Sequence, residues 1–156
     1  MLLGKLLPST LLVLLQVSVL FALGVLAFGM DVRGSWAGLA LMVVASTAFM
    51  TAMAMLLVAT LRTANQVMAV VNLGAMVFAG IGGAFAPVEA LPGWARAVAP
   101  ASPAYWMIDG FRGVVLEGAS LAATLRPAGI VAAMTLVVAL VAVWRLRFTD
   151  EKVWEG

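Results

Sequence analysis

The side chains that carry most enzyme chemistry are scarce in this sequence. It has neither histidine nor cysteine, so the common nucleophile–base pairs and the imidazole or thiolate metal ligands are absent. The seven acidic residues form no carboxylate pair inside an apolar stretch, where general acid–base catalysis would need one. The hydroxyl groups of Ser46, Thr47 and Thr51 have no base in the surrounding sequence. We therefore expect no enzyme activity and no catalytic, cofactor-binding or metal site in this chain.

The sequence also lacks the residues that ATP hydrolysis or ion coupling would need. A phosphate-binding loop of the form G-x-x-x-x-G-K-[ST] does not occur, because Gly4-Lys5 lacks the upstream glycine. The stretches Leu11–Met30, Trp36–Leu61 and Val67–Phe85 contain no charged residue, whereas proton-coupled membrane proteins carry ionisable groups within their spans. The sequence thus predicts neither ATP hydrolysis nor ion coupling by this chain, and a powered activity would need a partner.

The composition is typical of a membrane protein. Of the 156 residues, 65% are hydrophobic and 10% are charged, and the mean hydropathy is +1.14. Soluble domains carry roughly 45–50% apolar and about 25% charged residues, so this chain has too few charges to cover a water-soluble fold. The net charge of +2 is small and scattered, which argues against a nucleic-acid partner. We expect an all-α protein embedded in a lipid bilayer.

Long apolar segments predict about four transmembrane helices within a single domain, residues 1–156. They cover approximately residues 10–30, 36–61, 66–85 and 124–146. A helix rises about 1.5 Å per residue, so roughly twenty residues cross the hydrocarbon core. The run from Pro8 to Thr10 suits the start of the first helix, and Ser35 suits the N-cap of the second. Residues 62–66 are expected to form a tight polar turn.

A cleaved signal peptide is an alternative for the first segment. Lys5 followed by an apolar run matches the first half of that pattern. However, the run is longer than the usual hydrophobic region of a signal peptide, and no soluble domain follows a cleavage site. We therefore predict a spanning helix.

Lysines and arginines near the helix ends predict the orientation. With the N-terminus inside, the residues that face the cytoplasm are Lys5, Arg62, Arg145, Arg147 and Lys152. Arg33 lies in the short outer loop. The bias is diluted by further arginines in or beside the long outer segment, namely Arg96, Arg112 and Arg126. We predict a multi-pass protein of the plasma (inner) membrane with both termini in the cytoplasm.

Residues 87–118 form an external segment unlike the four spans. Its prolines cut it into short pieces, because each lacks a backbone donor and disfavours helix at the preceding residue. Its apolar and aromatic content favours short re-entrant or interfacial helices. Asp109 and Arg112 are three residues apart, so on a helix they share a face and can neutralise each other. The segment could act either as a cap on the bundle or as a gate.

An ordered series of motifs runs through this segment. Pro87-Val88-Glu89-Ala90-Leu91-Pro92-Gly93-Trp94 is followed by Pro100 and then by Pro103-Ala104-Tyr105-Trp106-Met107-Ile108-Asp109-Gly110-Phe111-Arg112-Gly113. In order and spacing these motifs resemble the extracellular segment of type-2 ATP-binding-cassette (ABC) exporter permeases. Leu3-Gly4-Lys5-Leu6-Leu7-Pro8, with Gln16 beyond it, is similar to that family's entry into its third span. Leu61-Arg62-Thr63-Ala64-Asn65-Gln66 is similar to its next cytoplasmic turn.

The resemblance implies a fold and a role. Permeases of this family have about six spans, work as dimers and bind two cytoplasmic ATPase subunits or domains. The implied function is export of an apolar or amphipathic substrate with ATP that is bound and hydrolysed by the partner. The implied partners are an ABC ATPase, a second permease copy and the lipid bilayer. Because the similarity begins at the third span, we expect this chain to be the C-terminal, four-helix part of a longer permease.

The resemblance also selects candidate functional residues. The candidates for the gate or re-entrant segment are Pro87, Glu89, Pro92, Trp94, Pro100, Pro103, Tyr105, Asp109 and Arg112. Gln16 and Asn72 are polar outliers within the spans; Asn72 either hydrogen-bonds between helices, which we favour, or lines a substrate path.

Small and flexible residues within the spans have a simpler interpretation. Ala75, Ala79 and Gly83 recur every four residues and predict close helix packing. The ten methionines suit either gap filling or a surface that adapts to varied ligands. The alternative function is a standalone four-helix scaffold or assembly protein, which would transport nothing and bind no ATPase.

Overall fold

The structure, a computed structural model, describes residues 2–61, 63–85 and 88–150 and consists of helices and their connections. The long helices are α1 (Leu2–Phe28), α2 (Trp36–Thr60), α3 (Ala64–Gly82) and α6 (Leu121–Asp150). Short elements connect α3 to α6: the 3-10 helices η1 (Val88–Ala90) and η2 (Ala99–Ala101), and the α-helices α4 (Gly93–Val98) and α5 (Pro103–Val115). The described residues include no β-strand.

Each long helix contains an apolar stretch that is long enough to cross a membrane. These stretches are Thr10–Phe28, Trp36–Thr60, Ala64–Gly82 and Leu121–Arg145. The predicted all-α membrane fold, with about four spans and short helices before the last one, is therefore confirmed.

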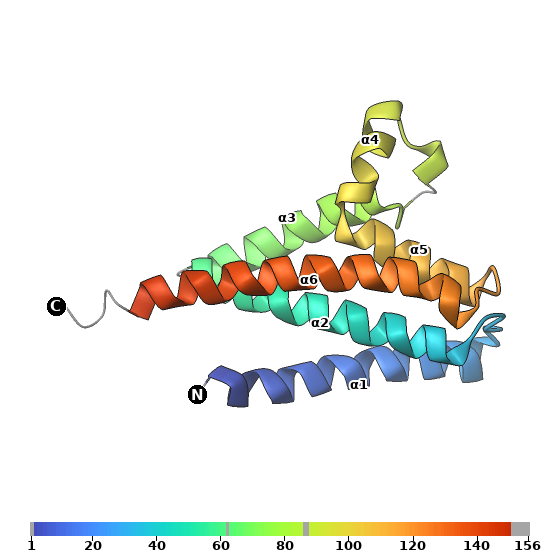
Figure 1. Ribbon diagram of the computed structural model, residues 1–156, viewed down its shortest axis with the longest axis horizontal. Helices are drawn as coiled ribbons and strands as arrows, with labels where there is room; N and C mark the ends of the chain where they lie inside the picture. Colours follow the sequence, from blue (N-terminus) through green and yellow to red (C-terminus); the bar gives the residue numbers. More distant parts are fainter. Residues whose placement is uncertain (1, 62, 86–87, 151–156) are drawn as a thin grey trace.

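The helices form a bundle centred on α2 and α6, which lie side by side over most of their length (Figure 1). Helix α1 packs along α2, and α3 diverges from the bundle as it leaves the end of α2. Helix α5 contacts α2, α3 and α6. The beginning of α1 and the end of α6 lie at one end of the bundle, while the α1–α2 loop lies at the other.

Side-chain and glycine caps define several helix ends. Ser35 is the N-cap of α2, as predicted, and its Oγ accepts a hydrogen bond from the Gly38 N–H at 3.3 Å. Thr63 caps α3 in the same way, accepting from the Gln66 N–H at 3.3 Å. Gly83 ends α3 with a φ of 89°, a left-handed conformation that glycine adopts without steric cost.

Three helices begin before the spans that the sequence predicts. Helix α1 begins at Leu2, with Pro8 inside it, because one proline removes one backbone hydrogen bond and the leucine-rich residues before it favour helix. The polar turn predicted over residues 62–66 is shorter, because the Thr63 cap draws residues 64–66 into α3. Helix α6 begins at Leu121 rather than near residue 124, because the Ser120 Oγ accepts a hydrogen bond from the Ala123 N–H at 3.4 Å.

Candidate functional site

Helix α5 is a half-length helix that runs antiparallel to the first half of α2. Near its end, Val114 packs in one buried cluster with Leu39. Nearer its start, Met107 packs in a second cluster with Phe49 of α2 and Val131 of α6. Phe49 lies near the middle of α2, so α5 begins at the level of that middle and rises to the end that holds the α1–α2 loop. This is the geometry of a re-entrant helix.

The C-terminal end of α5 is hydrogen-bonded to the loop between the first two spans. The Arg33 N–H donates to the Val115 carbonyl at 3.3 Å, and the Gly34 N–H donates to the Val114 carbonyl at 2.9 Å. The Ser35 N–H donates to the Ala119 carbonyl at 3.1 Å. Carbonyls in the last turn of a helix have no intrahelical partner, so the loop satisfies groups that would otherwise be orphaned.

Gly34 permits this close contact. A Cβ on Gly34 would lie 2.6 Å from the Val114 carbonyl oxygen and 2.7 Å from that of Ala119. No side chain fits there without moving the backbone. Nothing in the sequence around Gly34 shows that a distant helix end lies against it.

The N-terminal end of α5 is held by Trp106. Its indole N–H donates to the Pro100 carbonyl at 2.8 Å, which closes the turn between η2 and α5. Its ring packs edge-to-face with Tyr105, with 5.1 Å between ring centroids, and lies 5.9 Å from the guanidinium carbon of Arg126 on α6. Trp106 therefore links the re-entrant turn to the last span. The candidate set omits it, although an aromatic residue just after a helix-starting proline was a usable signal.

The remaining candidates of the external segment lie in different surroundings. Pro92 precedes α4 and is exposed, and Trp94 on α4 is 70% exposed. Pro100 is an exposed residue of η2, whereas Pro103 is buried at the first position of α5. Pro87 and the side chain of Glu89 lie outside the described residues.

Tyr105, Asp109 and Arg112 lie on one side of α5 and border a small polar pocket. The pocket has a volume of about 50 Å³ and is lined by Gly82, Gly83, Val88, Tyr105, Ile108, Asp109 and Arg112. The structure thus brings three of the candidate residues together beside the end of α3. Gln16 on α1 and Asn72 on α3 are exposed and border neither this pocket nor the groove described below.

The predicted pairing of Asp109 with Arg112 is replaced by another ion pair. The Nε of Arg112 lies 3.3 Å from Oε1 of Glu117, and both side chains are at least half exposed. After α5 the chain turns at Gly118, whose φ is 71°, and Glu117 lies beside the last turn of the helix. Helical spacing alone predicts pairs three or four residues apart, so it selected Asp109 instead.

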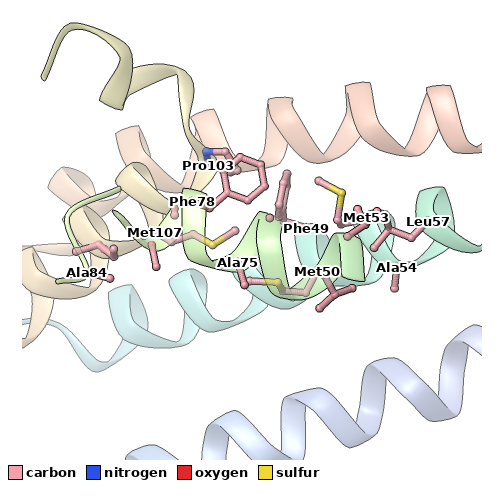
Figure 2. A pocket seen from close by; sticks show the side chains of 16 residues that line it. Phe49, Met50, Met53, Ala54, Leu57, Ala75, Phe78, Ala84, Pro103 and Met107 are labelled. Atoms are coloured by element: carbon pink, nitrogen blue, oxygen red, sulfur yellow. The ribbon is translucent and has the colours of Figure 1, made fainter. Parts of the chain in front are cut away.

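A larger apolar groove lies between α2, α3 and the start of α5 (Figure 2). Its volume is about 540 Å³. The apolar groove is lined by Phe49, Met50, Met53, Ala54, Leu57, Val70, Val71, Gly74, Ala75, Phe78, Ala79, Ala84, Pro103, Ala104, Met107 and Ile108. Every one of these residues is apolar, so the groove suits a hydrocarbon group.

Two of the small residues for which close helix packing was predicted, Ala75 and Ala79, line the apolar groove. Close packing occurs at Gly82, where a Cβ would lie 2.7 Å from the Ala104 Cβ and 3.0 Å from the Tyr105 nitrogen. Helix α3 therefore contacts α5 at Gly82, and the groove is open along the part of α3 that precedes this contact.

Comparison with known proteins supports the resemblance seen in the sequence. A profile of the ABC-2 type transporter family matches residues 1–116, which include α1 to α5. No curated protein and no solved structure matches the chain. The match covers more than half of the chain and agrees with its four apolar spans. The chain therefore belongs to the ABC-2 type transporter family and is a membrane-spanning component of an ABC transporter.

Proposed function

We propose that this chain is a permease that moves an apolar or amphipathic substrate outward, with ATP hydrolysed by a separate ABC ATPase and with a second permease copy as partner. The observation that carries the proposal is α5, a half-length helix held between α2, α3 and α6 beside an apolar groove. A helix in that place can open or close a path along the groove when the bundle moves. The absence of charged residues from the first three predicted spans supports an external source of energy.

Transport into inside-out membrane vesicles tests this function. Vesicles that contain the chain in its native complex should accumulate a fluorescent amphiphile when ATP is supplied, because outward export becomes uptake in that geometry. Uptake should stop when vanadate blocks the ATPase. Equal uptake with and without ATP, or no uptake of any amphiphile by an intact complex, would contradict the proposal and favour a scaffold role.

We also propose the plasma membrane, with both termini in the cytoplasm and α4 outside. The chain contains no cysteine, so single cysteines report topology without background. Ala97→Cys on α4 and Asn65→Cys at the start of α3 are matched probes, because both positions are exposed. A membrane-impermeant maleimide added to intact cells should label Ala97→Cys and should reach Asn65→Cys only after permeabilisation. The opposite labelling pattern would reverse the orientation.

A further inference from the structure

The side chain of Asn72 lies in the middle of a span and lacks a hydrogen-bond partner. Helix α3 covers Ala64–Gly82, so Asn72 lies within one residue of its midpoint. The side chain is exposed, and no other described residue forms a hydrogen bond with it. Lipid tails cannot bond to its amide, and a polar group without a partner is costly in the hydrocarbon core. Asn72 therefore needs a partner that this chain does not provide.

Asn72 lies on the side of α3 that is turned away from the apolar groove. Successive residues of an α-helix are rotated by about 100°, so Asn72 and Gly74 point about 200° apart. Gly74 lines the groove. All residues of α3 are described, and only Gly82, at its end, is buried. The side that carries Asn72 is therefore open to another molecule.

The surface around Asn72 suits the close approach of a second helix. Ala69 and Ala75 lie three residues before and three residues after Asn72, so they flank it on the helix surface. Small residues of this kind let two helix backbones pack closely in a membrane. Close packing is needed here, because the asparagine side chain is short. Asn72 thus combines a polar group with room for a partner helix.

Gln16, the exposed polar residue of α1, has different surroundings. The residues three and four positions away from it are all large, namely Leu12, Val13, Val19 and Leu20. These side chains would hold a second helix at a distance. Helix α1 also packs along α2, whereas α3 contacts only α4, η2 and α5 to a comparable extent. Asn72 is therefore the better centre for a contact between spans of different chains.

A second copy of the chain supplies the partner that Asn72 lacks. In a dimer with two-fold symmetry, a residue on the axis meets its own counterpart. Two asparagine amides complement each other, because the NH₂ group of each can donate to the carbonyl oxygen of the other. Two α3 helices that cross at this residue would satisfy both side chains at once.

We propose that two copies of α3 cross at Asn72 and that the two Asn72 amides are hydrogen-bonded to each other. This contact rests on the proposed function, which supplies the second permease copy as the partner. It leaves the apolar groove open, because the groove lies on the opposite side of α3.

Disulfide cross-linking in native membranes tests the contact, because the chain has no cysteine of its own. A disulfide requires two Cα atoms within about 7 Å of each other. Asn72→Cys, oxidised with copper phenanthroline, should therefore give a covalent dimer on a non-reducing gel. Gly74→Cys is the matched control, since it lies at nearly the same depth on the opposite side of α3, and it should remain monomeric.

Three results would overturn the proposal. A covalent dimer from Gly74→Cys and none from Asn72→Cys would make the groove the interface between copies. A covalent dimer from Gln16→Cys and none from Asn72→Cys would place the interface at α1. A monomeric Asn72→Cys that reacts with a water-soluble maleimide would show that this side of α3 lines a wet path.

A second pair of variants tests the hydrogen bond itself. Asn72→Leu should weaken the dimer about fivefold when the purified complex is diluted in detergent. Gln16→Leu also removes an exposed amide from a span, and it should leave the dimer unchanged. Equal effects of the two substitutions, or no effect of Asn72→Leu, would contradict the proposed bond.

These measurements need neither ATP nor a transport substrate. A complex that cross-links at residue 72 and exports nothing would contradict the proposed function alone. A complex that exports and gives no cross-link at residue 72 would contradict the Asn72 contact alone.

Discussion

Replacing Gly34 with valine is expected to detach the α1–α2 loop from the end of α5 and to abolish export. A side chain at this position would collide with the carbonyl oxygens of Val114 and Ala119. The loop would then lose three backbone hydrogen bonds. Each contributes about 0.5–1.5 kcal/mol, so we expect the free energy of unfolding to fall by about 1.5–4.5 kcal/mol. Denaturant unfolding in detergent measures that loss, and vesicle uptake measures export.

Gly113→Ala is the matched control for this substitution. Gly113 lies in the last turn of α5, where the α1–α2 loop makes its contacts, and a Cβ there would make an ordinary contact, 3.6 Å from the Ala119 Cβ. Alanine also favours helix over glycine by up to about 1 kcal/mol. Gly113→Ala should therefore fold and export normally. If Gly34→Val exports as well as the wild type does, the loop and α5 do not act as one unit.

Replacing Gly82 with valine should force α3 away from α5 and impair export. The new Cβ would lie 2.7 Å from the Ala104 Cβ and 3.0 Å from the backbone nitrogen of Tyr105, so the backbone of α3 or α5 would have to shift. Overpacking of this kind costs about 1–3 kcal/mol. Because this contact separates the apolar groove from the polar pocket, we expect a larger effect on export than on stability. Export and thermal unfolding should be measured on the same preparation, so that the two effects can be compared.

Gly80→Val separates the steric effect from the general cost of valine in a helix. Gly80 lies two residues earlier in α3, and a Cβ there meets nothing within 4 Å. Both variants carry the same change in helix propensity. The account requires Gly80→Val to export far better than Gly82→Val. Equal impairment would mean that the α3–α5 contact has no special role.

Hydropathy predicted the four spans because a helix must be long and apolar to cross a bilayer, and this property can be recognised within each segment alone. Ser35 could be recognised as a cap for a similar reason, since its partner lies only three residues away. The start of α1 was harder to predict, because Pro8 is typical of a helix start but lies inside this helix.

The contacts that build the candidate site could not be predicted, because they join residues far apart in the sequence. Gly34 in the α1–α2 loop contacts Val114 near the end of α5, and the periodicity of neither segment predicts that contact. The pairing of Arg112 with Glu117 depends on a turn beyond the helix. Ala75 and Ala79 have a pattern typical of close helix packing, yet they line a groove because α3 diverges from α2.

The central claim, that α5 moves relative to α3 during the ATP cycle, is tested most directly by a distance measurement between spin labels. Met76→Cys on α3 and Leu116→Cys at the end of α5 are suitable positions, because both side chains are exposed and the chain has no other cysteine. Asp31→Cys with Leu116→Cys is the control pair, since the loop and α5 are joined by hydrogen bonds.

The measurement compares the native complex without nucleotide and with ATP plus vanadate, by pulsed electron paramagnetic resonance. The account predicts that the distance between residues 76 and 116 shifts by several ångströms, while the distance between residues 31 and 116 stays constant. If the distance between residues 76 and 116 is the same in both states of a complex that transports, α5 is a fixed cap and the gating account is wrong.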